Sequence, residues 1–425
     1  MLTAVVGTNW GDEGKGRMVD LLSADYDYVV RYQGGNNAGH TVVNDKGTFV
    51  MNLLPSGILR PDTVNLLGPG MVIDLEHLYG EVEKLRTAGA AVEPGHLLLS
   101  ERATICLPYH RMQDILEEER LGDKKYGSTR RGISPVYADK YMKKTMRLGD
   151  LRHPESLREK AEELLEWKNL ILAGAYRRSG MTLQVLMDWL ERFGRPFADY
   201  ICDTTRVLSS AIAEEKNILF EAQLGALRDI DYGIYPYTSA STTLAAYAPI
   251  GAGVPFARVD QCIGIMKAYS SCVGEGPFAC EFFGEAGETL RAAGGEYGAA
   301  TGRPRRVGGF DAVASAYGVK MQGCHALALT KLDVLSYMKT IPVCVAYEIG
   351  GRKTTDFPSD IDELWAAKPV YEYLPGFEQD IHACRSAEEL PKAAMDYIRT
   401  LEALVHCPIR YVSVGAERDA IISLD

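Results

Sequence analysis

The segment Leu2-Thr3-Ala4-Val5-Val6-Gly7 is followed, after three residues, by Gly11-Asp12-Glu13-Gly14-Lys15-Gly16-Arg17. The apolar, β-branched first part predicts a buried strand, and the glycine-rich second part predicts a phosphate-binding turn at the start of a helix. Glycines let backbone N–H groups approach an anion closely, and Lys15 adds a positive charge. The chain is therefore expected to begin with a strand that leads into an anion-binding turn.

This turn departs from the standard P-loop pattern, which is a glycine, four residues, Gly-Lys and then serine or threonine. Here Asn9 lies five positions before Gly14, and Gly16 follows Lys15, so the hydroxyl that would bind Mg²⁺ is missing. A carboxylate, Asp12, lies inside the turn instead. It would repel phosphate unless a cation lies between them or the carboxylate handles a proton. The pattern predicts chemistry beyond simple nucleotide binding.

The composition limits the class of protein. The 425 residues are 46% hydrophobic and 24% charged, which is ordinary for a soluble globular chain. A net charge of −11 argues against nucleic acid or an anionic membrane as a partner. No apolar run is long enough to span a membrane, and glycines and acidic residues come too early for a signal peptide. Nine scattered cysteines without a C-x-x-C pair predict reduced thiols in a cytoplasmic protein and no structural metal.

Strand-like and helical patterns alternate along most of the chain. Apolar runs predict strands at 28–32, 64–67, 218–220, 262–266, 326–329, 343–346 and 411–414, and helical periodicity predicts helices at 75–87, 154–168, 182–192 and 387–404. Strands separated by helices predict an α/β fold, with a large, mainly parallel central sheet covered by helices on both faces. The economical prediction is one domain, residues 1–425, with a helical insertion at roughly 154–212.

Polar clusters follow several predicted strands, at the edge where ligands bind in such sheets. Gln33–Thr41 combines Asn and Gly turn residues with a Gly-His-Thr string, and either a plain loop or a site fits it. Gly127–Gly132 is rich in donors and fits a solvated basic loop as well as phosphate binding. Gly298–Arg306 carries three arginines that can grip carboxylate or phosphate, although a surface loop remains an alternative.

The fourth cluster, Thr330-Lys331-Leu332-Asp333, follows the predicted strand at 326–329. A carboxylate just past a strand can accept hydrogen bonds from both N1–H and the 2-amino group of guanine. Adenine lacks this donor pair, so Asp333 would favour GTP over ATP. Ser413–Ala416 could close the same base pocket, although a Lys and an Asp at a strand end are common without one.

Taken together and in chain order, Gly11–Arg17, Asn37–Thr41, Thr301–Arg306 and Thr330–Asp333 resemble the adenylosuccinate synthetase family. The resemblance extends from residue 2 to about residue 419 and includes Val29–Gly35, Leu54–Ile58 and Asp229–Asp231. It implies a cytoplasmic homodimer of AMP biosynthesis that joins IMP and L-aspartate, with hydrolysis of GTP to GDP and phosphate, and with Mg²⁺ as cofactor.

The resemblance also implies a role for the unusual carboxylate of the turn. Asp12 would take the N1 proton from IMP and ligate Mg²⁺, together with the backbone carbonyl of Gly39. The activated 6-oxygen would attack the γ-phosphate of GTP, and His40 would steady and protonate the transferring oxygens. The aspartate amine would then displace the 6-phosphoryl group. A base at the ring nitrogen, an acid at the oxygen and a cation near the phosphates form a coherent mechanism.

The same resemblance implies three sets of binding residues. Those for IMP are Asp12, Glu13, Gly14, Lys15, Asn37, Ala38, Gly39, His40, Thr129, Lys143, Gln223, Leu224, Ser239 and Arg303. Those for GTP are Gly11, Asp12, Glu13, Gly14, Lys15, Gly16, Arg17, Gly39, His40, Thr41, Arg305, Lys331, Leu332, Asp333, Ser413, Val414 and Gly415. Those for L-aspartate are Val273, Ala299, Ala300, Thr301, Gly302, Arg303, Pro304 and Arg305.

Several positions depart from the family pattern, mostly among the predicted nucleotide contacts. Gln223 comes one place early, so that Leu224 occupies the slot of an IMP-binding glutamine. Lys143 stands where an arginine reaches across the dimer, although it could equally belong to a solvated run with Lys140 and Lys144. The remaining departures are Arg17 for lysine, Ser128-Thr129-Arg130-Arg131-Gly132 for Thr-Thr-Gly-Arg-Gly, Ser239 for threonine and Ala300 for threonine.

These departures leave two alternatives to a synthetase of this family. One is a paralogous GTP-dependent ligase with a different purine nucleotide or amine acceptor. The other is a GTP-binding regulatory protein without ligase activity, against which the presence of both Asp12 and His40 argues.

Overall fold

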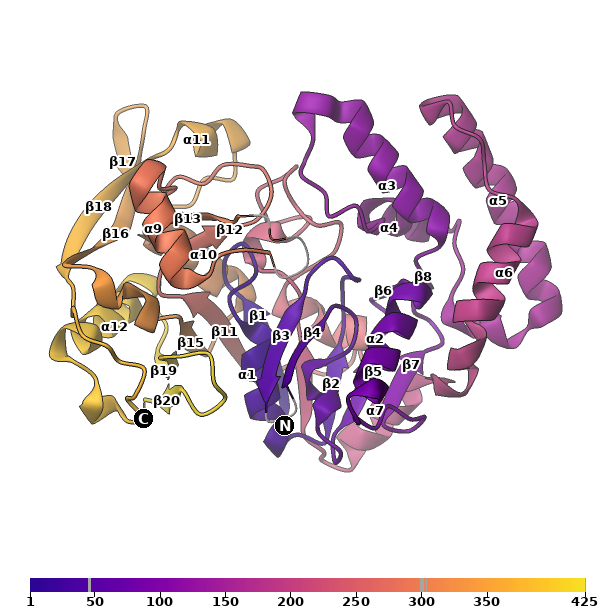
Figure 1. Ribbon diagram of the computed structural model, residues 1–425, viewed down its shortest axis with the longest axis horizontal. Helices are drawn as coiled ribbons and strands as arrows, with labels where there is room; N and C mark the ends of the chain where they lie inside the picture. The colour runs from indigo at the N-terminus through magenta and orange to yellow at the C-terminus, as the bar shows by residue number, and fades with distance from the viewer. Residues whose placement is uncertain (45–46, 299–301, 303, 425) are drawn as a thin grey trace.

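A computed structural model describes residues 1–44, 47–298, 302 and 304–424 (Figure 1). Its centre is a ten-stranded sheet in the order β20-β19-β15-β11-β1-β10-β2-β5-β7-β9, parallel throughout except for β20. The strands are β1 (Leu2–Gly7), β2 (Tyr28–Arg31), β5 (Val64–Leu67), β7 (Leu97–Ser100), β9 (Ile201–Cys202), β10 (Ile218–Glu221), β11 (Gln261–Lys267), β15 (Ala326–Thr330), β19 (Ile409–Ser413) and β20 (Ile421–Ser423).

Helices cover both faces of this sheet, as predicted. Val5 of β1 packs with Met18 and Val19 of α1, whereas its neighbours Ala4 and Val6 share a core on the other face with α7. Side chains alternate between the two faces of a strand, so β1 is buried on both. The helices are α1 (Lys15–Leu22), α2 (Leu75–Thr87), α3 (Pro108–Leu121), α4 (Ile133–Met142), α5 (Pro154–Tyr176), α6 (Leu183–Phe193), α7 (Thr204–Ala213), α8 (Ala248–Ala252), α9 (Gly284–Gly294), α10 (Ala312–Gln322), α11 (Ile361–Ala366) and α12 (Lys392–Val405).

Smaller sheets lie around the central one. The predicted strand at 343–346 is part of β16, which is outside the central sheet: β16 pairs in parallel with β14 and in antiparallel with β17 and β18. The pairs β3–β4 and β12–β13 are antiparallel, and β6–β8 is parallel. Their bounds are β3 (His40–Asn44), β4 (Gly47–Met51), β6 (Val72–Ile73), β8 (Thr104–Ile105), β12 (Ser270–Cys272), β13 (Arg306–Gly308), β14 (Phe310–Asp311), β16 (Thr340–Ile349), β17 (Arg352–Thr354) and β18 (Lys368–Pro375).

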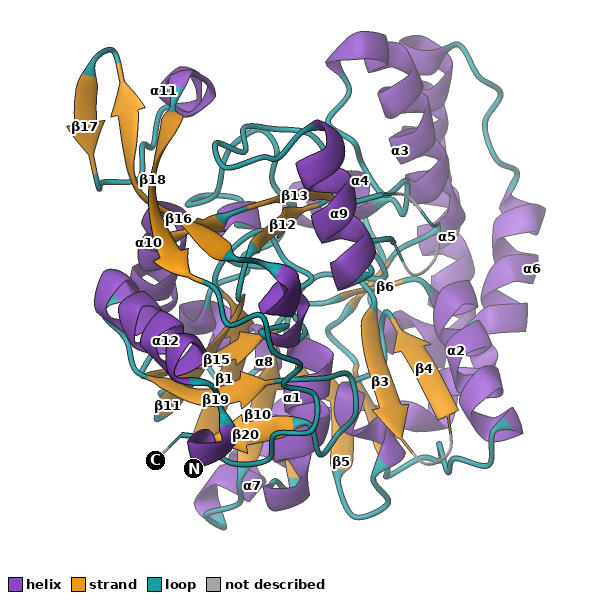
Figure 2. Cartoon of the chain, turned by 60° about the vertical axis from the view of Figure 1, so that its left-hand side comes forward, coloured by secondary structure: helices purple, strands orange, loops and turns teal. Residues whose placement is uncertain are grey.

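Two groups of elements lie at opposite ends of the molecule. Helices α3 to α6 stand together at one end, and β16, β17 and β18 with α11 project at the other (Figures 1 and 2). The predicted helical segment 154–212 holds α5, α6 and α7, and also β9, the edge strand of the central sheet. That the chain acts as a single domain stays a prediction. Across the described ranges, no helix is both long and apolar enough to cross a membrane.

Candidate active site

The glycine-rich turn connects the centre of the sheet to α1. Gly11, Asp12 and Gly14 have positive φ angles of 99°, 59° and 100°, so the turn depends on left-handed backbone that glycine adopts without strain. The buried carboxylate of Glu13 accepts hydrogen bonds from the N–H groups of Asn9 (3.1 Å) and Gly11 (2.8 Å). It also forms an ion pair with Lys15 Nζ at 2.6 Å. Glu13 thus fixes the turn and holds the lysine next to it.

The missing P-loop hydroxyl has a steric explanation. A Cβ on Gly16 would lie 2.6 Å from His40 Cβ and 3.1 Å from Ser56 Oγ, closer than side chains normally approach. His40 is the first residue of β3, which packs beside α1, and its side chain is buried. The histidine therefore occupies the space that serine or threonine would need, and the residue after Lys15 has to be glycine.

His40 is hydrogen-bonded through Nδ1 to the carboxylate of Glu221, the last residue of β10. Ser56 donates to the same carboxylate from its backbone N–H (2.8 Å) and its hydroxyl (2.7 Å). Burial and the nearby charge of Arg31 lower the pKa of His40, and Glu221 opposes them in part. Burial alone would raise the pKa of Glu221, but the contact with His40 and the charge of Arg31 lower it. Glu221 is therefore ionised beside a neutral His40.

On the other side of the turn, Asp12 belongs to a chain of alternating charges. Arg305 contacts both Asp12 (Nη2–Oδ2, 3.1 Å) and Glu296 (Nη1–Oε2, 2.9 Å). Glu296 also binds Lys267 Nζ at 2.7 Å and the hydroxyl of Tyr269 at 2.5 Å. Although burial opposes it, these partners lower the pKa of Glu296 to about 2. Two of the predicted site residues, Asp12 and Arg305, are thus in direct contact.

The predicted base pocket also comes together, from segments far apart in the sequence. Arg17 Nη1 donates to the carbonyl of Gly415 at 2.5 Å and to the hydroxyl of Ser413. Burial raises the pKa of Asp333. The charge of His382, whose Nε2 lies 3.4 Å from Asp333 Oδ2, opposes this rise. The backbone N–H of Leu332 donates to the carbonyl of Ser413 at 3.2 Å, and Val414 is buried beside them.

Two further contacts tie this pocket to its surroundings. Thr330 Oγ1 donates to the carbonyl of Glu13 at 2.6 Å, which joins the end of β15 to the phosphate turn. Lys331 Nζ donates to the carbonyl of Gly294 at 2.5 Å, at the end of α9. The glycine-rich turn and the segment predicted to form the base pocket are therefore joined directly by a hydrogen bond.

Gln223 and Leu224, the shifted pair, lie between the turn and the loop after β2. The side chain of Gln223 is buried and donates to the carbonyls of Gly35 (2.5 Å) and Asn52 (2.9 Å), so it braces this loop. Leu224 has a φ of 59° and lies against Gly11, where an added Cβ would be 3.2 Å from its Cα.

Other residues predicted to contact IMP surround this pair. Asn37 accepts a hydrogen bond from the N–H of Gly35 at 3.2 Å. The hydroxyl of Ser239 is 3.1 Å from that of Ser241, which donates to Gln33 at 2.9 Å. Ala38 is buried, whereas Gly39 and Thr41 are exposed, so the loop presents a backbone edge to solvent beside His40.

Other predicted site residues are exposed or lie outside the described residues. Thr129 is exposed between α3 and α4, and Lys143 is exposed just after α4, with a φ of 62°. Val273 is 43% exposed and its carbonyl accepts from Arg228 at 2.5 Å. Gly302 and Pro304 are exposed, whereas Ala299, Ala300, Thr301 and Arg303 lie outside the described residues.

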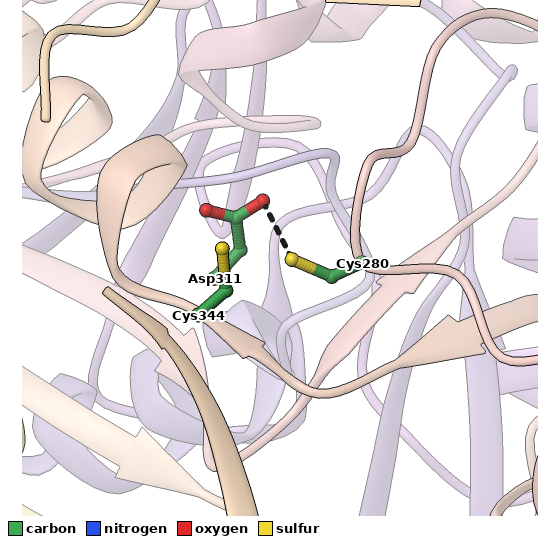
Figure 3. A group of neighbouring side chains, drawn as sticks. All are labelled: Cys280, Asp311 and Cys344. Carbon is green, nitrogen blue, oxygen red and sulfur yellow. Dashed lines mark hydrogen bonds between the residues drawn. The ribbon is translucent and has the colours of Figure 1, made fainter. Parts of the chain in front are cut away.

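Within the described part of the chain, one trio of acidic or sulfur side chains is close enough to suggest a metal site. The ligand atoms of Cys280, Asp311 and Cys344 lie within 4.8 Å of one another (Figure 3). Cys280 Sγ donates to Asp311 Oδ2 at 3.1 Å, the hydroxyl of Tyr347 donates to the same oxygen at 2.6 Å, and Asp311 Oδ1 accepts from Ala314 N–H at 3.0 Å. Burial raises the pKa of the Cys280 thiol well above its usual range. The trio is a hydrogen-bonded part of the core with a protonated thiol.

Sequence reasoning missed several residues that shape the site: Ser56, Glu221, Lys267, Glu296 and His382. Two of them carried a readable signal, because Glu221 and Lys267 are charged residues at the ends of buried apolar strands, where site residues gather. The others are recognisable only once the fold brings them to the turn.

Comparisons with known proteins agree on the family. The family profile described as adenylosuccinate synthetase matches residues 4–422. The chain is 44% identical to the adenylosuccinate synthetase of Bifidobacterium adolescentis, over 99% of this chain and 98% of that protein. It is 46% identical to adenylosuccinate synthetase 2 of Pseudoalteromonas translucida, over 98% of each.

Two solved structures resemble the fold. The fully ligated adenylosuccinate synthetase of Plasmodium falciparum superposes over 100% of both chains with a TM-score of 0.94 and 32% identity. A cyanophage S-2L succinoaminodeoxyadenylate synthetase, bound to dGMP and dATP, shares the fold with a TM-score of 0.62 and 21% identity, over 99% of this chain and 94% of that one. The match to the family along nearly its whole length, with close relatives of the same name, shows that this chain belongs to the adenylosuccinate synthetase family of GTP-dependent ligases that form carbon–nitrogen bonds.

Proposed function

We propose that the chain joins IMP and L-aspartate into adenylosuccinate through a 6-phosphoryl-IMP intermediate, with GTP converted to GDP and phosphate. The observation that supports this most is that His40 packs against Gly16 of the same turn that holds Asp12. A candidate acid and a candidate base then flank one phosphate-binding turn. A proton acceptor for N1 and a proton donor for the transferring oxygens suit the transfer of a phosphoryl group to the 6-oxygen of IMP. The reaction would be the first step from IMP to AMP.

In the first half of the proposed reaction, the carboxylate of Asp12 takes the N1 proton of IMP. The electron pair moves onto the 6-oxygen, which forms a bond to the γ-phosphorus of GTP as the bond to the β-phosphate oxygen breaks. His40 Nε2 faces the transferring oxygens, because Nδ1 is held by Glu221. Lys15 and Arg305 supply positive charge on either side of the turn.

In the second half, the amine of L-aspartate attacks C6 and the bond from C6 to the phosphorylated oxygen breaks. Phosphate leaves with that electron pair, and the amine loses its proton. We propose that the segment 299–305 and Val273 hold L-aspartate. Support comes from Arg305, whose guanidinium reaches Asp12 and can form paired hydrogen bonds with a carboxylate.

Mg²⁺ is the cofactor that we propose, with the carboxylate of Asp12 and the backbone carbonyl of Gly39 as its protein ligands. Both are hard oxygen donors, which suit this ion. The side chain of Asp12 is 26% exposed, and Gly39 is exposed, so both are accessible to a hydrated cation. When bound, the ion would offset the negative charge of the transferring phosphoryl group.

For the nucleotides, we propose that Gly11–Arg17 and Gly39–Thr41 hold the phosphates of GTP and that Asp333 selects its base. Support comes from Arg17, which links the start of α1 to Ser413 and Gly415. IMP would lie on the other side, against Asn37–His40, Gln223, Leu224 and Ser239. The bracing of this loop by Gln223 supports a preformed surface there.

A homodimer with shared active sites is also proposed, in which Lys143 of each chain reaches the IMP phosphate bound by its partner. Support comes from its exposed position at the end of α4. We further propose a cytoplasmic location, which the nine free cysteines favour because reduced thiols persist there.

A product assay tests the function directly. IMP, GTP, Mg²⁺ and L-aspartate are supplied together and then omitted one at a time, and adenylosuccinate, GDP and phosphate are measured. We expect all three products only with the complete set. Ligation with a different nucleotide or amine, but none with IMP and aspartate, would establish the paralogous ligase, and GTP binding without turnover would establish the regulatory protein.

A further inference from the structure

Glu221 stands out among the buried charged groups to which the proposed reaction gives no role. We propose that Glu221 is a positioning residue, which fixes the tautomer and orientation of His40 and makes its Nε2 the nitrogen that faces the transferring phosphoryl oxygens. The inference deepens the proposed function and rests on the role of His40 in it. It assigns to Glu221 no contact with substrate.

The geometry holds the carboxylate in one orientation. Its Oε1 is hydrogen-bonded to both His40 Nδ1 and Ser56 Oγ, and its Oε2 accepts from the Ser56 N–H at 2.8 Å. Glu221 is fully buried at the end of β10, so water does not compete for either oxygen. An ionised carboxylate only accepts hydrogen bonds, so His40 Nδ1 must carry a hydrogen. In the neutral ring, the free lone pair is then on Nε2.

Arg31 holds the charge of the carboxylate from the neighbouring strand. It is directly opposite Glu221 on β2 and fully buried, and its Nε and Nη2 have no hydrogen-bond partner among the described residues. One arginine and one carboxylate balance each other in the core. Lys15 of α1 is already paired with Glu13.

The remaining charged neighbour does not change this balance. Glu81 of α2 lies near Arg31, but its carboxylate accepts from the backbone N–H groups of Leu53 and Leu54 at 3.0–3.2 Å and interacts with His77 at 3.0 Å. Ser56 is uncharged. Glu221 is therefore the carboxylate that holds the ring of His40.

The test compares Glu221→Gln with Ser56→Ala, a control that removes one hydrogen bond from the same carboxylate and keeps its charge. For Glu221→Gln we expect kcat to fall about 10- to 100-fold, with the KM values for IMP and GTP little changed. In Ser56→Ala kcat should fall less, because the carboxylate keeps its charge and its contact with His40. Unchanged kcat in Glu221→Gln would overturn the proposal.

A spectroscopic measurement keeps the test decisive if Glu221→Gln does not fold. Histidine ¹⁵N NMR of the ligand-free wild-type protein, assigned with His40→Asn, should show the hydrogen on Nδ1, and a hydrogen on Nε2 would refute it. If His40→Asn itself ligates normally, it is the proposed role of His40 that fails, since the tautomer is measured without turnover.

Discussion

Replacing Gly16 by serine would give the turn the hydroxyl that a P-loop has after its lysine, and we expect this change to inactivate the protein. The added Cβ would lie 2.6 Å from His40 Cβ, whereas ordinary contacts begin at 3.4 Å. His40 or α1 must therefore move by at least 0.8 Å, the difference between these two distances. The hydrogen bond from His40 to Glu221 limits where the ring can go.

The size of the effect follows from this displacement. A misplacement of about 1 Å in a catalytic group costs on the order of 10² in rate, so kcat should fall by about that factor or more. Overpacking a buried site also costs about 1–3 kcal/mol, so the free energy of unfolding should decrease in this range. Gly16→Ala should behave like Gly16→Ser, because the Cβ causes the collision and the hydroxyl only adds to it.

The measurements are kcat with saturating IMP, GTP and L-aspartate, and denaturant unfolding of the same preparations. Gly174→Ala in α5 is the matched control, since a Cβ there meets nothing within 4 Å. It should keep full activity and gain stability, because alanine is the better helix former. If Gly16→Ala keeps more than a tenth of the wild-type kcat and unfolds at the wild-type denaturant concentration, the steric explanation for the altered turn is wrong.

Three other substitutions test separate parts of the site, and a fourth, at His110, tests the pH dependence of stability. Asp12→Asn should lower kcat by about 10²–10⁴ with the fold intact, because an amide cannot accept the N1 proton, and a variant with a tenth of wild-type kcat would remove Asp12 from the base role. Asp333→Asn should shift preference from GTP toward XTP by about tenfold to a hundredfold, since a charged hydrogen bond is lost, and unchanged nucleotide preference would contradict the base pocket. Lys143→Ala should raise the KM for IMP but not for GTP, and mixing it with Asp12→Asn chains should restore IMP affinity in mixed dimers; no restoration despite subunit exchange would refute a shared site. Burial and the charge of Lys168 lower the pKa of His110 to about 4, so the unfolded chain binds the proton more tightly, and stability should be lost as the pH falls from about 6.5 toward 4; His110→Gln should flatten this dependence in denaturant titrations at several pH values.

Local patterns were sufficient to predict much of the fold. The helix predicted at 75–87 matches α2 in both bounds, since Asp74 accepts from His77 N–H at its start and Lys84 and Arg86 lie in its last turn. The predicted strand at 343–346 is found in β16, which lies outside the central sheet, and the apolar run alone does not specify its pairing partner. Sheet membership depends on contacts far apart in the chain.

The residues of the site also divide into those that a local pattern predicts and those that depend on contacts between distant segments. The turn at Gly11–Arg17 and the segment Thr330–Asp333 at and after the end of β15 are short sequence motifs, and the sequence alone predicted both. The charged group around His40 is different, because Arg31 and Glu221 meet only through the register of β2 and β10. No local pattern sets that register. The partner of His40 could therefore be found only in the folded protein.

The charges of the site are arranged in pairs that nucleotides can replace. In a protein of net charge −11, Lys15 is paired with Glu13, and Arg305 is shared between Asp12 and Glu296. Each cation is thus held where a phosphate or carboxylate ligand would need it, without an unpaired buried charge in the free protein. In the proposed reaction, an anionic ligand that binds Arg305 would draw its guanidinium away from Asp12 and leave both carboxylate oxygens to the N1–H of the purine and to Mg²⁺. Proton abstraction would then be linked to the binding of that ligand.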